Sequence, residues 1–378
     1  MKNCMTIIAA ATALACVVAG CGPSDGSEEL DLGRKAYEAR DLKKAEKLFT
    51  ECVTAAPENA DALIYLARIK LDVGDIPSAR SWVDKALQVA GDDVDVKLVS
   101  AQVSWHEKDY KKAAADFASV ANDTKLAPEL RAQGWTGLGI VEMANERHHI
   151  ARIAFLRAIR LNRREASAWY HLGLVYRDKF DYPEAALEQF DIFVRLEASA
   201  SPRVQKTLRT IIPALKEQIA REAANRPGVS KRDSAACAAA IATAEAAWKK
   251  GNYRNARSAY GTALSADPLS YPAALGLAKA WEKTDTTKSG QTKAFENYKL
   301  ACSLRPGAIS TFLKTGDLAA RLGYHAQAAE IFSRAVAASP TSITAIDGLI
   351  RALQRSGGNK DEARAYQLYR ESIPLKRK

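Results

Sequence analysis

Residues 169–176 read Trp-Tyr-His-Leu-Gly-Leu-Val-Tyr, and this stretch decides the fold. Trp169, Leu172, Gly173 and Tyr176 are separated by three, one and three residues, so they share one face of a helix. Gly173 costs that helix about 1 kcal/mol relative to alanine. The cost is understandable if a second helix crosses at Gly173, because a missing side chain lets two backbones approach closely.

The residues that follow complete a helical hairpin. Asp181 is expected to begin the second helix, with Pro183 tolerated in its first turn. Ala185 is predicted to be the small residue that faces Gly173. The pattern resembles the tetratricopeptide repeat (TPR) family, in which helix-turn-helix units stack into an α-solenoid. The resemblance implies an all-α fold, because one hairpin cannot bury its apolar face without stacked neighbours.

The same unit recurs along the chain. Ala45, Ala79 and Ala113 are each 34 residues apart, which is the TPR period. They are predicted to be the small residues of three successive second helices. The matching small residues of the first helices are Gly33, Ala67 and Ala101. Counting in this way predicts about nine units, five in a first array and four in a second.

The pattern lapses between the two arrays. After residue 199 one apolar stripe runs along a predicted capping helix that Pro213 should kink. The stripe consists of Val204, Leu208, Ile211, Leu215 and Ile219. Residues 225–233 combine Pro, Gly and several charges, which favours a linker. We therefore predict two TPR arrays joined by a capping helix and linker. The predicted boundaries are 1–20 (signal peptide), 21–27 (tether), 28–199 (first array), 200–233 (capping helix and linker) and 234–378 (second array with a basic tail).

The N-terminus reads as a lipoprotein signal. Lys2 precedes an apolar run that is too short to span a bilayer. The run ends in Val18-Ala19-Gly20-Cys21, which resembles a bacterial lipobox and implies lipidation at Cys21. The alternatives are an ordinary signal peptide, an uncleaved anchor, or lipidation at Cys16, which follows Ala13-Leu14-Ala15 and fits the lipobox less well. The resemblance also implies a sorting rule, under which Gly22 favours the outer membrane of a Gram-negative envelope, facing the periplasm.

Charge narrows the class of partner. The formal net charge is +11 and the isoelectric point is about 9.3, which favours anionic partners. Nucleic acid is not expected as a partner, because a lipid-anchored envelope protein rarely meets it. Cys52, Cys237 and Cys302 remain after the signal region and are predicted to be buried small hydrophobes.

No catalytic constellation is found in the sequence. His148 and His149 are adjacent and point in different directions on a helix, so they make a poor metal site. The spacing of a zinc protease, a phosphate-binding Gly-rich loop and a nucleophile elbow are all missing. We therefore predict no enzyme activity, no metal and no cofactor.

The TPR resemblance places a partner in the groove lined by the first helices. The residues predicted to line it in the first array are Arg34, Tyr37, Arg68, Trp105, His106, Tyr170 and Arg177. In the second array they are Trp248, Lys249, Lys279, Lys283, Arg321, Arg351 and Arg355. The mixed aromatic and basic first set suits an extended peptide, and the second set is more basic. Ordinary solvated charges are the alternative for any one of them.

These features predict a non-enzymatic scaffold lipoprotein that binds other proteins or peptides, some of them acidic. The resemblance is to TPR lipoproteins that assist envelope assembly or secretion, such as secretin pilotins, β-barrel assembly partners and polysaccharide-export scaffolds. The fold does not choose among them. The alternative function is binding of an anionic glycan or cell-wall polymer by the basic groove of the second array.

Overall fold

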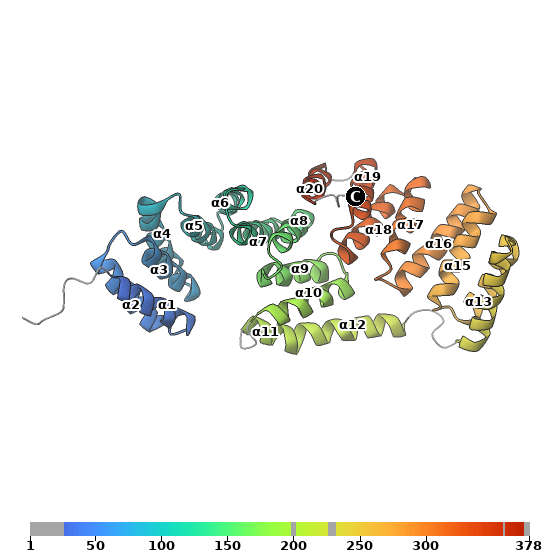
Figure 1. The fold of residues 1–378 in the computed structure, drawn as a ribbon, viewed down its shortest axis with the longest axis horizontal. Coiled ribbons are helices and arrows are strands. Elements are labelled where there is room, and N and C mark those ends of the chain that lie inside the picture. The colour runs from blue at the N-terminus through green and yellow to red at the C-terminus, as the bar shows by residue number, and fades with distance from the viewer. Residues whose placement is uncertain (1–25, 198–201, 226–231, 358–359, 374–378) are drawn as a thin grey trace, which may run out of the picture. The chain divides into compact units, whose positions relative to one another are not determined.

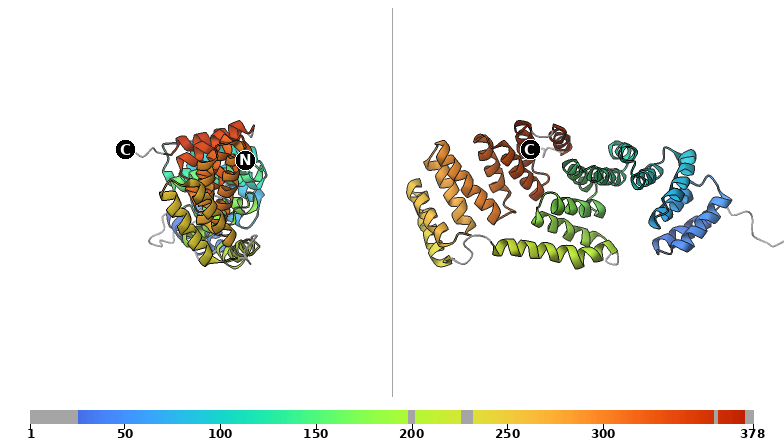
Figure 2. Two further views of the ribbon diagram at one scale, coloured as in Figure 1. Left: turned by 90° about the vertical axis from the view of Figure 1, so that its right-hand side faces the viewer. Right: turned by 180° about the vertical axis from the view of Figure 1, so that it is seen from behind.

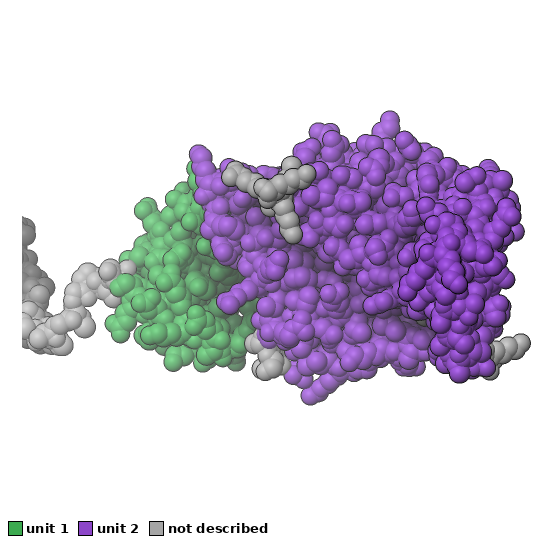
Figure 3. Space-filling view, turned by 45° about the vertical axis from the view of Figure 1, so that its right-hand side comes forward, with its two compact units in different colours: residues 1–107 green, residues 108–378 purple. Residues whose placement is uncertain are grey.

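The computed structural model describes residues 26–197, 202–225, 232–357 and 360–373. Within these ranges all regular elements are helices, which confirms the predicted all-α fold (Figure 1). The predicted signal peptide, Cys21, most of the tether, residues 226–231 of the linker and the end of the basic tail lie outside the described residues. The chain divides into two compact units, 1–107 and 108–378, which Figure 3 colours separately.

The first unit holds two helical hairpins and one further helix. The hairpins are α1–α2 and α3–α4, and α5 packs on α3 and α4. Their cores are formed by buried side chains such as Phe49, Leu66 and Val99. The bounds are α1 (Ser27–Glu38), α2 (Leu42–Ala55), α3 (Ala60–Asp72), α4 (Ile76–Ala90) and α5 (Val94–His106).

The second unit holds the remaining helices, most of them again in consecutive packed pairs (Figure 2). The bounds are α6 (Tyr110–Asn122), α7 (Pro128–Ala144), α8 (His148–Leu161), α9 (Ala166–Asp178), α10 (Pro183–Leu196), α11 (Pro202–Lys206), the π-helical turn η1 (Thr207–Ile211), α12 (Ile212–Ala224), α13 (Ser234–Lys249), α14 (Tyr253–Ala266), α15 (Tyr271–Thr284), α16 (Lys288–Leu304), α17 (Ile309–Arg321), α18 (His325–Ala338), α19 (Ile343–Arg355) and α20 (Lys360–Glu371).

Eight of the nine predicted units are hairpins within one compact unit of the described chain. The predicted third unit, which pairs Ala101 with Ala113, has its two helices on opposite sides of the division and stays a prediction. The predicted array boundaries at 199 and 233 also stay predictions, because the compact units divide at residue 107 instead.

Capping residues begin the second helices of the early units. The side chains of Asp41, Asp75 and Asp109 each accept a hydrogen bond, at 3.0 to 3.2 Å, from the backbone N–H three residues further on. Such caps satisfy donors that the first helical turn leaves without a partner. These caps recur every 34 residues, so the helix starts repeat with the same period as the core.

In several repeats an aromatic side chain of a second helix packs against a glycine of a first helix. A Cβ added to Gly33 would lie 2.6 Å from Phe49, and one added to Gly173 would lie 2.9 Å from Phe190. Gly173 therefore sits at a close helix crossing, as its sequence context predicted. The prediction of Ala185 as the facing small residue is wrong, because Ala186 is the fully buried one. The turn before α10 has four residues, where the turns before α2 and α8 have three, and this shifts the register by one.

The predicted capping helix exists but does not follow one regular stripe. The predicted stripe included Leu208, which is exposed, whereas Thr207, Ile211 and Ile212 are buried. The cause is the π-helical turn η1, whose wider i→i+5 bonding rotates the buried face. Pro213 follows immediately at the start of α12, and because Ile211 and Ile212 keep helical backbone angles, the helix continues from η1 into α12.

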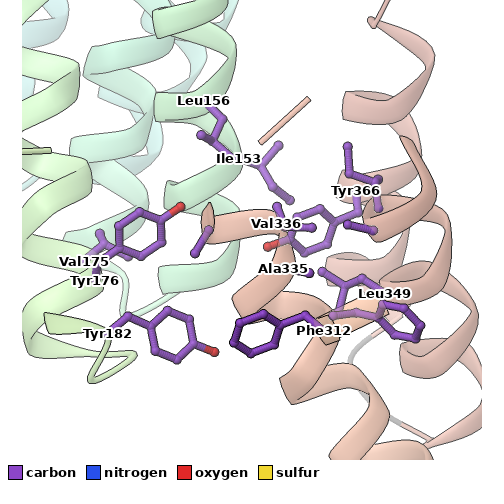
Figure 4. Packing of buried hydrophobic residues seen from close by; sticks show 14 of the residues in the cluster. Ile153, Leu156, Val175, Tyr176, Tyr182, Phe312, Ala335, Val336, Leu349 and Tyr366 are labelled. Carbon is purple, nitrogen blue, oxygen red and sulfur yellow. The ribbon is translucent and has the colours of Figure 1, made fainter. Parts of the chain in front are cut away.

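The last repeats pack back onto the middle of the chain within the second unit. One continuous core includes side chains of α8 and α9 together with side chains of α17 to α20 (Figure 4). At its centre the fully buried Arg152 of α8 donates hydrogen bonds to Ser333 of α18, at 2.8 Å, and to the Tyr366 hydroxyl of α20. The Arg152 guanidinium also lies 4.6 Å from the centroid of the Phe180 ring. Residues 148–182 and 311–373 are therefore held in one folded unit.

Candidate functional site

A chain of three connected hollows runs along the first helices of the second array. The first, of about 400 Å³, is lined by α13, α15, α16 and α17 and has Trp248 and Leu275 in its wall. The second, of about 720 Å³, lies between α15, α17 and the turn that joins α15 to α16. The third, of about 380 Å³, lies between α17 and α19. Lys283 and Lys314 line both the first and the second hollow, so the hollows form one groove.

We call this surface the basic groove. It presents an apolar end at α13 and cationic side chains along the rest of its length. The side chains that define it are Trp248, Leu275, Lys279, Lys283, Lys288, Lys314, Arg321 and Arg355.

The turn between α15 and α16, together with the start of α16, forms one wall of the basic groove. Thr286 of the turn and Lys288 and Gln291 of α16 line the second hollow. Gln291 donates a hydrogen bond of 2.8 Å to the backbone oxygen of Asp285. The hydroxyl of Thr287 accepts a hydrogen bond from the Gly290 backbone N–H. These bonds hold the turn against α16, so the wall is built into the fold.

Most cations of the basic groove have no counter-charge. Lys279, Lys283, Lys288 and Arg355 are exposed and form no ion pair with a described carboxylate. The second hollow alone is lined by four cationic side chains and one carboxylate. Side chains of one sign that gather in a concave surface reinforce each other's potential and attract anions.

The one carboxylate of the second hollow is Glu282, and it collects three hydrogen-bond donors. Its Oε1 lies 2.9 Å from Arg321 Nη2 and 3.1 Å from Lys314 Nζ. Its Oε2 accepts a hydrogen bond of 3.0 Å from the Tyr298 hydroxyl. Burial raises the pKa of Glu282, but the bonds from Arg321 and Lys314 outweigh burial and hold the pKa below its usual value. Glu282 is therefore charged at neutral pH.

Comparison with known sequences identifies the repeat. Two family models, both described as tetratricopeptide repeat, match residues 36–103 and residues 136–201 and 241–288. This chain is a tetratricopeptide repeat protein. TPR arrays generally bind other proteins or peptides and are generally non-catalytic scaffolds. No curated protein sequence matches the chain.

Several solved structures are similar in fold. The chain is 16% identical to Pseudomonas aeruginosa PilF, with 68% of this chain and 97% of that chain covered and a TM-score of 0.40. For PilW, described as a widely conserved type IV pilus biogenesis factor, the identity is 12%, the coverage 67% and 98%, and the TM-score 0.41. For MamA from Desulfovibrio magneticus RS-1 the values are 19%, 47% and 98%, and 0.37.

The structure brings together only some of the residues predicted to line the groove of the second array. Trp248, Lys279, Lys283, Arg321 and Arg355 line the basic groove. Arg351 lines a separate hollow of about 320 Å³ beside Arg370, and exposed Lys249 lines none of these four hollows.

Sequence analysis missed Lys288, Lys314 and Glu282. The repeat pattern could have identified Glu282. Trp248, a predicted groove residue, follows the small residue Ala244 by four residues, and Glu282 follows the small residue Ala278 by the same distance.

In the first unit the predicted TPR groove residues are engaged by acidic neighbours. Arg34 donates to Asp61, and Arg68 donates to Asp95 at 2.9 Å, in each case 27 residues further along the chain. The Tyr37 hydroxyl donates to Asp72 at 3.0 Å, and burial together with Asp72 raises the pKa of Tyr37 to about 12. These pairs link neighbouring repeats and leave little net charge for a ligand.

The other predicted residues also have neighbours. The ring centroids of Trp105 and His106 lie 4.8 Å apart, in an edge-on arrangement, at the end of the first unit. In the second unit Arg177 pairs with Asp178 at 2.8 Å. The Arg203 guanidinium covers Tyr170, at 5.1 Å from the ring centroid.

The described ranges contain no group of three or more His, Cys, Asp or Glu side chains placed to hold a metal ion. They also contain no helix that is both long and apolar enough to cross a bilayer. Cys52, Cys237 and Cys302 are buried and form no disulfide with a described residue, which confirms their predicted burial. Burial raises the pKa of the Cys302 thiol to about 11, which makes it a poor nucleophile.

Proposed function

We propose that this chain is a lipid-anchored, non-enzymatic TPR scaffold of the bacterial cell envelope, and that its basic groove binds an acidic segment of a partner protein. One observation carries the proposal: a continuous groove is lined by six cations from three repeats, four of which form no ion pair with a described carboxylate, and it has an apolar wall at one end. A purely electrostatic surface has no need of the apolar wall.

The arrangement of the groove selects the type of segment. Trp248 and Leu275 offer a flat apolar surface beside Lys279 and Lys283. Aromatic side chains bury large areas and commonly anchor interfaces. We therefore expect a segment with one aromatic or aliphatic anchor followed by acidic residues.

The envelope location rests on the sequence. The lipobox-like Val18-Ala19-Gly20-Cys21 supports lipidation, and Gly22 supports the outer membrane. Assembly or secretion machinery of the envelope, such as a pilus, a secretin, outer-membrane assembly or polysaccharide export, is the setting we propose. A Cys21→Ala variant tests the anchor. If Cys21 carries the lipid, this variant should leave the membrane fraction. Retention in outer membranes after a high-salt wash would contradict it.

Groove binding is tested with a fluorescein-labelled peptide of one phenylalanine followed by four glutamates. We expect the wild-type protein to bind it and the variant with Lys279→Glu, Lys283→Glu and Lys314→Glu to lose binding. A matched control carries Lys250→Glu, Arg254→Glu and Arg364→Glu, which change three exposed cations of the same array outside the groove. The control should bind as the wild type does. An equal loss of peptide binding in both variants would show that only the net charge of the protein matters and that the groove is not the binding site.

The glycan alternative is an outcome of the same assay. A heparin fragment supplies dense negative charge without an apolar anchor. If heparin binds more tightly than the peptide and Trp248→Ala leaves both affinities unchanged, the groove is a polyanion site and the peptide proposal fails. Binding of the peptide should also weaken less with salt, because its apolar contact is not screened.

A further inference from the structure

The basic groove contains its own anionic group. Glu282 stands in the second hollow, with its side chain 17% exposed. Lys314 and Arg321, whose side chains are 48% and 57% exposed, both point their charged ends at Glu282 Oε1. These two cations are thus long and half in solvent, but they are held at an internal carboxylate.

Glu282 does not depend on the two cations for its position. The Tyr298 hydroxyl donates to its other oxygen, and Tyr298 is itself buried. Burial and the neighbouring carboxylate raise the pKa of Tyr298, so this hydroxyl keeps its proton and stays a donor. Lys314 and Arg321 can therefore turn away while the carboxylate remains fixed from below.

We propose that Glu282 is a built-in competitor for the anionic group of the ligand, and that the groove takes a carboxylate which Lys314 and Arg321 reach by releasing Glu282. This inference rests on the proposed function of the groove. A ligand carboxylate would then replace Glu282 as the partner of Lys314 and Arg321. The wild-type affinity for the ligand is therefore lower than it would be if all the groove cations were free. It also lets Lys283 and Lys288, which have no such partner, make the first contact.

The test compares two neutralising substitutions in the same groove. Glu282→Gln keeps the size of the side chain and an oxygen for Tyr298, but it releases the two cations. Asp317→Asn removes one negative charge from the third hollow, and exposed Asp317 forms no ion pair with a described residue. Both variants raise the groove's net charge by the same amount, and only Glu282→Gln frees Lys314 and Arg321.

The affinity of the labelled Phe-Glu₄ peptide should rise about two- to thirtyfold in Glu282→Gln, because each exposed pair contributes only a small free energy. Asp317→Asn should change it less than twofold. Glu282→Gln combined with Lys314→Gln and Arg321→Gln should lose the gain. Circular dichroism checks that each variant is folded.

The possible results separate the two levels of the proposal. If the wild type binds and Glu282→Gln binds equally or more weakly, Glu282 positions the cations and the competitor role is overturned. Equal gains from Glu282→Gln and Asp317→Asn would also overturn it, since only the general field would matter. If neither the wild type nor Glu282→Gln binds the peptide, the proposed function itself fails.

Discussion

Gly348→Ala tests the packing that holds the second array together. Phe332 of α18 is 2% exposed and lies between two glycines, Gly316 of its own hairpin and Gly348 of the next. A Cβ at Gly348 would lie 2.4 Å from Phe332 Cε1, and one at Gly316 would lie 2.7 Å from Cζ. Because a first helix closes on each face of the ring, Phe332 cannot move away from either.

The expected effect has a clear sign. Overpacking of a filled core typically costs about 1–3 kcal/mol. In an open helical position, by contrast, Gly→Ala stabilises by roughly 1 kcal/mol. Gly261 of α14 provides the matched control, because nothing lies within 4 Å of a Cβ added there. We expect Gly348→Ala to lower the urea midpoint of unfolding and Gly261→Ala to raise it, both measured by circular dichroism.

A double variant refines the test. Phe332→Leu removes the atoms that the new methyl group meets, so Gly348→Ala should cost less in that background than alone. A raised midpoint for Gly348→Ala in the wild-type background would refute the reasoning. It would mean that α19 does not close on Phe332 and that the repeat stacking described here is wrong.

Three further predictions address the second unit. Tyr366→Phe should destabilise the protein by about 1–3 kcal/mol in chemical denaturation, because buried Arg152 loses a hydrogen-bond acceptor. An unchanged free energy of unfolding would mean that Arg152 finds another acceptor. Cleavage at a protease site engineered into 225–233 should give two fragments that still co-elute on gel filtration, because α18–α20 pack with α8 and α9; separation of the fragments would show that this contact is weak. Burial lowers the pKa of His171 to about 4, so the unfolded chain binds more protons than the folded one between pH 6.5 and 4. The free energy of unfolding should therefore decrease as the pH is lowered from 6.5 to 4, by less in His171→Gln than in the wild type, and equal pH profiles would contradict it.

The order of helices could be predicted from sequence because a TPR hairpin is a local structure. Gly173 and its neighbours specify one crossing, and the period carries that crossing to the next unit. The errors arose where the period is broken by single residues. One extra residue in the turn before α10 moves the buried position from Ala185 to Ala186. The π-helical turn η1 rotates Leu208 to the exposed side of its helix. No simple residue pattern announces either change.

The basic groove was predictable only in part. Counting around the first helices put Lys279, Lys283 and Arg321 on one face, and all three line the hollows of the basic groove, because position in the repeat fixes the face. It did not reveal that Glu282 holds Arg321, since that contact depends on side-chain reach between two repeats. The same limitation applies to Arg34, whose partner belongs to the next repeat.

One repeat position explains why Lys279 of the second array has no carboxylate partner. Arg34 and Arg68 each follow the small residue of a first helix directly, and each pairs with an aspartate six residues before the next small residue. Lys279 follows Ala278 in the same way, but the corresponding place before Gly316 is taken by Ser310. Ser310 lines the same hollow as Lys279 and cannot neutralise it. In the first unit the cation at this position forms an ion pair with the next repeat. In the second array Lys279 occupies the same position without such a pair and is therefore available to a ligand. Ser310 at the acidic position is thus the reason that Lys279 lacks the inter-repeat partner that Arg34 and Arg68 have.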